Sequence, residues 1–319
     1  MTTTSARRAP GWKVWLALWI VYVVWGSTYL AIRIQVRTLP PLFAAGARFF
    51  VAGMSLYCVL LIRRGRKGVG VTSLQLRNCA VVGICLFLGA NGMVGLAEQE
   101  VPSSLAALIL SSVPLWVILY RTVTGDRVGR GTLVGVAIGF AGIAILVLPE
   151  SLPSGAPFES VLLLLFASAS WAFGSFFSTR RAMPEDLLVS SGYQMITGGV
   201  ALFVAGLVRG EGASLEPSTW SGESLLALGY LIAFGSLVAF TAYAWLLQSA
   251  PISKVATYAY VNPIVGILLG SIILDEAVTG TTLLGAAIIV GSVAFIIRKE
   301  ALRRRVPEPR AALSSSEST

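Results

Sequence analysis

The chain is built largely from long apolar runs, and these runs constrain its fold more than any other feature. Each is about 17–25 residues long, the length that an α-helix needs to cross the hydrocarbon core of a bilayer. In lipid every backbone polar group must find a partner within the protein, which such runs achieve as helices. The runs are continuous and do not alternate with polar residues, which argues against a β-barrel. The sequence therefore predicts an all-α integral membrane protein.

The composition supports this class. Hydrophobic residues make up 55% of the 319 residues and charged residues 12%, roughly half the charged share of a soluble domain. The net charge of +9 does not indicate nucleic-acid binding, because the basic residues lie in short loops beside apolar runs. The chain contains no histidine, which excludes histidine-based catalysis, metal ligation and proton relay. Cys58, Cys79 and Cys85 show neither a disulfide framework nor the spacing of metal ligands.

Ten membrane-spanning helices fit the apolar runs, and Pro and Gly residues mark the turns between them. The expected spans are 14–32, 42–62, 78–97, 104–121, 131–148, 160–178, 187–208, 224–247, 254–273 and 281–297. With the N-terminus placed in the cytoplasm, 20 of the 24 Lys and Arg residues lie on the cytoplasmic side, while the outer loops carry acidic residues. This bias predicts that both termini are cytoplasmic.

The second half of the chain repeats the first. Gln99, Pro102, Ser104, Ala107, Pro114, Ile118 and Leu119 recur at one constant spacing as Gln248, Pro251, Ser253, Ala256, Pro263, Ile267 and Leu268. Each copy holds five spans, an odd number, so the two copies must enter the membrane from opposite faces. The sequence predicts two inverted five-helix repeats, at 14–148 and 160–298, joined by a periplasmic linker at 149–159. A cytoplasmic segment at 1–13 and a disordered cytoplasmic tail at 299–319 complete the chain.

Neutral polar and aromatic residues deep within the spans predict a cavity suited to small amphipathic solutes. These residues are Trp25 and Ser27 in span one, Asn91 in span three, Trp171 in span six, Tyr243 in span eight, and Tyr258 and Asn262 in span nine. Hydrogen bonding between helices is the alternative explanation for each of them.

Two charged residues are candidates for a charged gate or for ion coupling, because charge inside a membrane is costly. Arg48 lies about a third of the way into span two. Its side chain either extends to the outer interface or finds a carbonyl or carboxylate partner inside the bundle. Glu98 ends span three, where it is either a solvated loop charge or folds back into the bundle to attract cations or carry a proton.

Pro114 and Pro263 occupy equivalent positions in spans four and nine. Each removes a backbone donor, so the two are either tolerated kinks or a pair of hinges. Asp126 and the pair Asp275-Glu276 lie in equivalent loops, where we expect them to cap the helices that follow.

Several short motifs occur in a characteristic order within this duplicated frame. They are Trp25-Gly26-Ser27-Thr28, Leu39-Pro40-Pro41, Ala47-Arg48-Phe49, Ala97-Glu98 with the segment 101–107, and Asn262-Pro263 followed by Asp275-Glu276. Together they resemble EamA-type members of the drug/metabolite transporter superfamily. The resemblance implies an exporter in the bacterial inner membrane and a central cavity lined by spans one, three, four, six, eight and nine. It thereby adds Ser111 of span four to the candidate cavity residues.

The sequence thus predicts a secondary transporter that exports amino acids, related amphipathic solutes or drugs by alternating access. Its expected partners are a small-molecule substrate and the lipid bilayer; proton coupling is an open alternative, as is the choice between monomer and homodimer. An antiporter of sugar phosphates or nucleotide sugars would need several basic residues facing the cavity, and Arg48 alone is weak support. A lipid enzyme would need an acid–base set, and a sensor would need no transported ligand. No catalytic, metal-binding or cofactor-binding residue is predicted.

Overall fold

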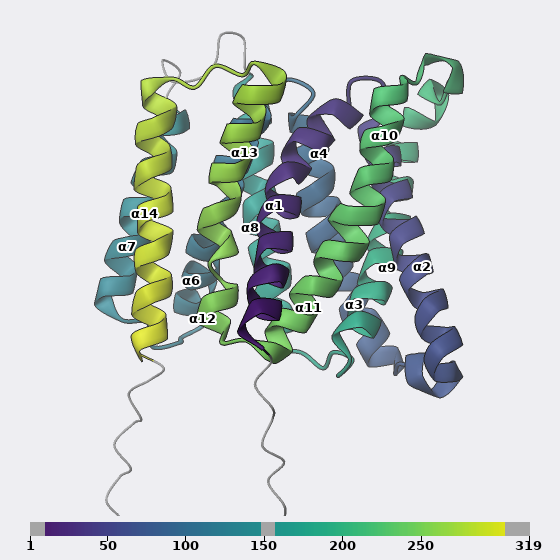
Figure 1. Ribbon diagram of the computed structural model, residues 1–319, viewed down its shortest axis with the longest axis horizontal. Helices are drawn as coiled ribbons and strands as arrows, with labels where there is room; N and C mark the ends of the chain where they lie inside the picture. The colour runs from purple at the N-terminus through teal and green to yellow at the C-terminus, as the bar shows by residue number, and fades with distance from the viewer. Residues whose placement is uncertain (1–9, 148–156, 304–319) are drawn as a thin grey trace, which may run out of the picture.

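The computed structural model describes residues 10–147 and 157–303, and every regular element in these ranges is helical. The helices stand side by side in one bundle (Figure 1). The first half contains α1 (Gly11–Gln35), α2 (Pro41–Val69), α3 (Ser73–Gly83), η1 (Ile84–Gly92), α4 (Met93–Ala97), α5 (Ser103–Leu110), α6 (Val113–Val123) and α7 (Arg130–Val147). The second half contains α8 (Phe158–Ser178), α9 (Leu187–Val208), η2 (Glu211–Ser214), η3 (Pro217–Thr219), α10 (Gly222–Tyr230), η4 (Leu231–Val238), α11 (Ala239–Ser249), α12 (Ile252–Val255), α13 (Tyr258–Leu274) and α14 (Gly280–Arg303).

The predicted all-α membrane fold is confirmed. Within the described ranges, nine helices or helix series are long and apolar enough to cross a membrane, and the apolar helix Tyr258–Leu274 corresponds to the remaining predicted span. The predicted linker and tail lie largely outside the described residues. Where the structure does describe the tail, it differs from the prediction, because α14 continues through Arg303. Glu300 explains this extension, since its carboxylate accepts hydrogen bonds from Arg121 and Thr132.

Equivalent helices of the two repeats pack against each other. The most extensive contacts join α2 to α9 and α7 to α14, which are spans two and seven and spans five and ten. Glycines allow the α2–α9 backbones to approach closely. A Cβ atom at Gly53 would lie 2.8 Å from the backbone nitrogen of Ile196, and one at Gly199 would lie 2.7 Å from that of Phe50. Such reciprocal packing is what a two-fold axis between inverted repeats produces.

Spans three and eight, which are also repeat counterparts, each contain a π-helical segment, η1 and η4. A π-helix widens the turn and weakens the regular backbone ladder, and such segments occur frequently at functional sites. Carbonyl oxygens next to or within these segments accept side-chain hydrogen bonds. Cys85 accepts from the Ser170 hydroxyl at 2.9 Å, and Gly235 accepts from the Trp25 indole at 3.2 Å.

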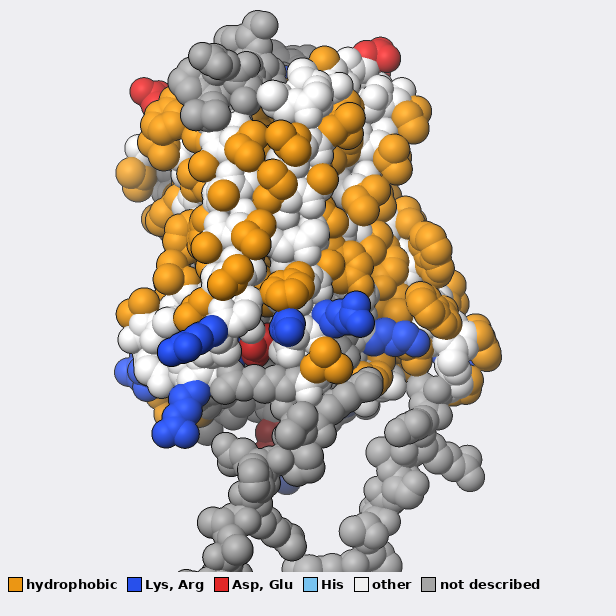
Figure 2. Space-filling view, turned by 90° about the vertical axis from the view of Figure 1, so that its left-hand side faces the viewer, with side chains coloured by type: hydrophobic (Ala, Val, Ile, Leu, Met, Phe, Trp, Pro, Cys, Tyr) orange, Lys and Arg blue, Asp and Glu red, His pale blue; other side chains and the backbone are white. Residues whose placement is uncertain are grey.

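Charge divides the two ends of the bundle. In Figure 2, apolar side chains cover the middle of the visible face and Lys and Arg side chains gather at its lower end. Helix α1 begins and helix α14 ends at this same end of the bundle (Figure 1). We call it the basic end and define it by Arg121, Arg180 and Lys299. The acidic end, defined by Glu98, Glu211 and Glu276, is the opposite one. An apolar belt between two polar ends fits a protein that spans a bilayer.

Candidate functional site

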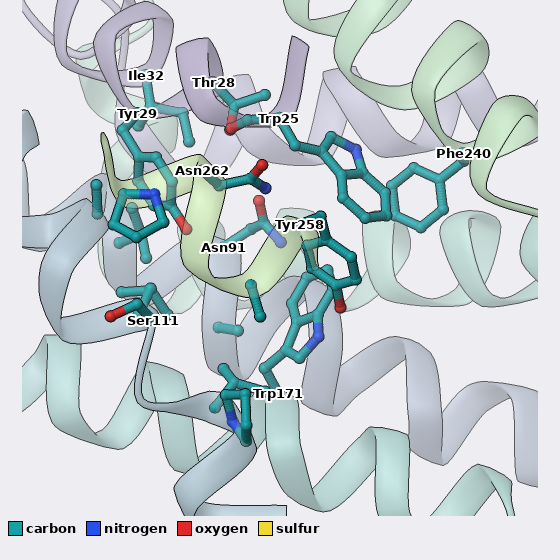
Figure 3. A pocket seen from close by; sticks show the side chains of 18 of the residues that line it. Trp25, Thr28, Tyr29, Ile32, Asn91, Ser111, Trp171, Phe240, Tyr258 and Asn262 are labelled. Carbon is teal, nitrogen blue, oxygen red and sulfur yellow. The ribbon is translucent and has the colours of Figure 1, made fainter. Parts of the chain in front are cut away.

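A cavity of about 120 Å³ lies between the two halves of the bundle. Residues of α1, α2, η1, α4, α5 and α6 from the first half and of α8, α11 and α13 from the second half form its wall (Figure 3). Six of the eight predicted cavity residues line it: Trp25, Asn91, Ser111, Trp171, Tyr258 and Asn262. The structure therefore brings together residues that are far apart in the sequence, and their role in binding substrate stays a prediction.

The other two predicted residues lie away from the cavity wall. Ser27 is two positions after Trp25 and so points to a different side of α1. Its hydroxyl lies 2.6 Å from the hydroxyl of Tyr230. Tyr243 packs behind the wall, with its ring centroid 5.0 Å from that of Trp25 and 5.7 Å from that of Tyr258. These two residues are thus placed to support the cavity rather than to contact its contents.

Trp25 is the centre of an aromatic cluster on one side of the cavity. Its ring centroid lies 5.1 Å from that of Phe240 and 5.3 Å from that of Tyr258, both in edge-on arrangements. The indole nitrogen donates to the Gly235 carbonyl, which fixes the ring plane. Aromatic pairs at these distances attract one another beyond simple burial of area. The cluster therefore presents a rigid apolar surface to whatever enters the cavity.

Two asparagines, one from each half, add polar groups. Figure 3 shows the side chains of Asn91 and Asn262 directed into the same space. The Asn91 amide nitrogen donates to the Leu86 carbonyl at 2.9 Å. With its nitrogen as donor, Asn262 reaches the carbonyls of Tyr258 at 3.2 Å and Tyr22 at 3.3 Å. These bonds fix both side chains, so the cavity has rigid polar groups of the kind that orient a small ligand.

Several lining residues were not predicted from the sequence. Tyr29, Phe49 and Phe240 also line the cavity. Tyr29 lies one helical turn after Trp25, so the helical period did contain a signal for it. Phe49 and Phe240 are apolar residues among apolar neighbours, and no sequence pattern distinguishes them from residues that face lipid.

The two prolines occupy different local structures. Pro114 lies at the start of α6, directly after the turn at Ser111 and Ser112 that separates α5 from α6. Pro263 lies inside the continuous helix α13, and the interruption in its span comes earlier, at residues 256–257. Both prolines line the cavity. A hinge role stays a prediction, and the bending points of the two halves are not at equivalent positions.

Arg48 does not extend to the outer interface. Its side chain is buried, it lines the cavity, and its Nε donates to the Ser236 hydroxyl at 3.0 Å. The partner is therefore a hydroxyl within η4, and not the carbonyl or carboxylate that the sequence suggested.

Glu98, the residue directly after the membrane-spanning segment Ser73–Ala97, folds back into the protein. Its side chain is completely buried, and neither carboxyl oxygen has a hydrogen-bond partner within residues 10–147 and 157–303. Arg33 donates to its backbone carbonyl and not to the carboxyl group. Burial and the nearby Glu276 carboxylate raise the pKa of Glu98 well above its ordinary value, while Arg33 acts in the opposite direction. The geometry therefore favours a protonated carboxyl group.

Glu276 caps a helix of the opposite repeat. Its carboxylate accepts from the backbone nitrogen and hydroxyl of Ser103 at 2.7 and 2.8 Å, and from the Ser104 nitrogen at 2.9 Å. Glu211 caps α2 in the same way, through the nitrogens of Leu42 and Phe43. Helix N-termini attract anions through their free N–H groups and the helix dipole. Both carboxylates thus join the second half of the chain to the first at the acidic end.

The expectation that Asp126 and Glu276 cap the helices following them was wrong. Glu276 caps α5, which precedes it by many residues. Asp126 instead binds the guanidinium groups of Arg180 at 2.6 Å and Arg121 at 3.3 Å. These contacts lower the pKa of Asp126, chiefly through the Arg180 hydrogen bond. These contacts could not be read from the sequence, because Ser103 and Ser104 lie far from Glu276 along the chain and Arg180 lies far from Asp126.

In the described ranges, nine membrane-length spans and the shorter apolar helix α13 form two halves with a shared cavity between them, which is an architecture that membrane transporters use. No group of three His, Cys, Asp or Glu side chains able to hold a metal ion occurs in the part of the chain that the structure describes.

Comparison with known proteins identifies the family. The model of the EamA-like transporter family matches residues 12–148 and 159–298, so the chain belongs to this family and the resemblance seen in the sequence is confirmed. The inner membrane transporter YedA of Escherichia coli K12 is 38% identical over 281 residues, covering 88% of this chain and 89% of YedA. A probable amino-acid metabolite efflux pump of the same organism is 28% identical, covering 85% and 90%. One crystal structure, at 20% identity, shares the fold with a TM-score of 0.61, covering 92% of this chain and 99% of that one.

Proposed function

We propose that this transporter exports small amphipathic metabolites, such as amino acids, related solutes or drugs, across the bacterial inner membrane by alternating access. The observation that carries the proposal is that both halves build the cavity wall. Movement of one half against the other would therefore change the access to the cavity. Its volume of about 120 Å³ is below the ~300 Å³ at which ligand pockets usually begin. Substrate binding would accordingly require the halves to move apart.

Two features support the substrate class and the direction of transport, and a third concerns the orientation of the chain in the membrane. The aromatic cluster around Trp25 and the amides of Asn91 and Asn262 suit a solute with both apolar and polar parts. The related efflux pump is named for amino-acid metabolites. The basic end, where α1 begins and α14 finishes, would face the cytoplasm under the positive-inside rule. Both chain ends would then be cytoplasmic.

Transport of sugar phosphates or nucleotide sugars is less well supported. A phosphate monoester carries a charge of about −1.5 to −2 near neutral pH. Among the lining residues in the described ranges, Arg48 is the single charged one. The cavity would therefore leave part of the phosphate charge uncompensated in a medium of low dielectric constant.

Membrane vesicles of known orientation test the direction. Vesicles prepared inside out from cells that produce the protein should take up labelled amino acids faster than vesicles from cells without it. Right-side-out vesicles should instead lose preloaded label faster. Uptake in the right-side-out preparation alone would show an importer and contradict the proposal.

Proton coupling through Glu98 is part of the proposal. In the structure, the carboxyl group is sealed from water at the acidic end, beside Glu276 and Arg33 and near the Tyr29 hydroxyl. Opening of this end would hydrate the group, favour its ionised form and release a proton. Closing would require the proton to return. Opening and closing of this end would then be linked to the release and uptake of one proton at Glu98.

A Glu98→Gln variant should change how stability depends on pH. The folded protein holds the Glu98 proton more tightly than the unfolded chain does, so wild-type stability falls as pH rises above the ordinary glutamate pKa of about 4.3. The slope is at most about 1.4 kcal/mol per pH unit, and it ends once pH exceeds the raised pKa. Glutamine carries no such proton. Thermal unfolding in detergent between about pH 5 and about pH 8 should therefore show a flatter profile for the variant than for wild type.

The exposed acid Glu100 provides the control for this measurement. A Glu100→Gln variant should keep the wild-type pH profile. If Glu98→Gln also keeps it, Glu98 does not hold a proton in the folded protein and the coupling proposal is lost.

A further inference from the structure

We propose that Arg48 binds the carboxylate of the transported substrate, so that the cargo is a monocarboxylate with an adjoining apolar or aromatic body. This inference rests on the proposed function and specifies its substrate class. It assigns Arg48 to recognition, whereas the sequence suggested a gate or an ion-coupling residue.

The first argument is the cost of the charge. Arg48 lies within the membrane-spanning part of α2, and its side chain is buried in the protein, with 4% of the residue exposed. Its Nε binds the Ser236 hydroxyl, and no carboxylate of the described ranges forms an ion pair with it. A guanidinium group presents a planar fork of N–H donors, and the Ser236 bond uses the edge at Nε. A buried cation without an anionic partner is expensive, and a substrate anion would supply that partner.

The second argument is that the guanidinium group is held in place. Ser236 fixes it from η4, and its Cζ atom lies 4.5 Å from the centroid of the Phe49 ring. Gly235 leaves the room that it needs, because a Cβ atom at that position would lie only 3.2 Å from Nη2 of Arg48. A snorkelling side chain would need none of these contacts. A fixed guanidinium fork is the geometry that recognises a carboxylate in two-point fashion.

The third argument is what lies beside the charge. The carbonyl of the same Gly235 accepts the hydrogen bond from Trp25, so one turn of η4 connects the cation to the aromatic cluster. A carboxylate on Arg48 would therefore place the neighbouring part of the substrate near the rings of Trp25 and Tyr258. The amide groups of Asn91 and Asn262 line the same cavity and would provide polar contacts for a group such as an amine. One cation and no acidic lining residue among those described match a single negative charge better than a phosphate.

Matched ligands test this inference on the purified full-length protein. L-phenylalanine, its uncharged-carboxyl analogue L-phenylalaninamide, and phenyl phosphate are each added at millimolar concentration, and thermal stabilisation is recorded. Wild type should be stabilised by phenylalanine clearly more than by the amide or the phosphate. In Arg48→Gln the affinity for phenylalanine should fall about ten- to hundred-fold, to that of the amide. Arg48→Lys should keep part of the preference, because it retains the charge but not the planar fork.

Two further variants keep the test decisive. Ser236→Ala keeps the positive charge of Arg48 but removes the hydrogen bond that holds its Nε. This variant should weaken phenylalanine binding less than Arg48→Gln does. Arg37→Gln removes an exposed arginine at the acidic end that lies 4.0 Å from Glu223, and it should bind phenylalanine as wild type does. Equal stabilisation by acid and amide, an undiminished preference in Arg48→Gln, tighter binding of phenyl phosphate, or no response to phenylalanine would each overturn the inference. If vesicles still transport amino acids in any of these cases, the proposed function stands and only the role of Arg48 is wrong.

Discussion

Replacing Glu276 with alanine is expected to lower the free energy of unfolding by about 2–4 kcal/mol. The carboxylate accepts three hydrogen bonds at the N-terminus of α5, from Ser103 and Ser104. Loss of a helix cap alone costs about 0.5–2 kcal/mol, and hydrogen bonds to a charged group are worth more than neutral ones. The bonds also join the second repeat to the first, so their loss should loosen the acidic end. Thermal or denaturant unfolding of the purified protein measures the effect.

The neighbouring acid makes a close control. Asp275 is exposed and has a left-handed backbone conformation, with φ of 52°, which asparagine tolerates. Asp275→Asn should therefore unfold almost as wild type does, and Glu276→Gln should fall between it and Glu276→Ala because glutamine keeps one acceptor oxygen. Equal stability of Glu276→Ala and Asp275→Asn would contradict the capping role.

Replacing Trp25 with alanine is expected to abolish most transport. The indole packs against Phe240, Tyr243 and Tyr258 and donates to the Gly235 carbonyl, so its loss removes the centre of the aromatic cluster. Large-to-small changes of aromatic residues in packed sites cost about 3–5 kcal/mol. If about 3 kcal/mol of this acts on substrate binding, the affinity falls by roughly a hundred-fold. Trp25→Phe keeps the ring packing but not the hydrogen bond, and it should retain part of the activity.

Trp19 provides the control on the same helix. Its side chain is 59% exposed on the outside of the bundle, where lipid would cover it. Trp19→Ala should transport at a rate close to that of wild type, measured per molecule of protein in reconstituted vesicles. Equal loss of activity in the two alanine variants would mean that Trp25 acts through general stability and not through the cavity.

The fold could be predicted from sequence because its determinants are coarse. Run length sets the spans, and the duplication sets the inverted halves. The side preference of Lys and Arg concerns which end faces the cytoplasm, and that orientation stays a prediction. None of these signals requires knowledge of which residues touch. Six of the eight predicted residues line the cavity, and their role in binding substrate stays a prediction. Deep amide groups such as those of Asn91 and Asn262 are costly against lipid, so their polarity favoured positions inside the bundle.

The finer features depend on helix rotation and on long-range partners. In α1 the apolar residues surround the helix, so the sequence did not separate Ser27, which contacts Tyr230, from Trp25, which lines the cavity. The caps made by Glu211 and Glu276 join loops to helices that are far away in sequence. The two π-helical segments also have no distinctive amino-acid composition that would reveal them in the sequence. Such details follow from packing between helices, which a single sequence does not encode in a readable form.

The central claim is that the two halves alternately open one cavity to each side of the membrane. Solute counterflow tests it most directly. Liposomes containing the purified protein are loaded with an unlabelled amino-acid mixture and diluted into buffer with a trace of labelled phenylalanine. An alternating-access carrier should accumulate label transiently above the external concentration, and the Trp25→Ala variant should not. Label that merely equilibrates would reveal a channel, and label that enters no faster than in protein-free liposomes would contradict the account altogether.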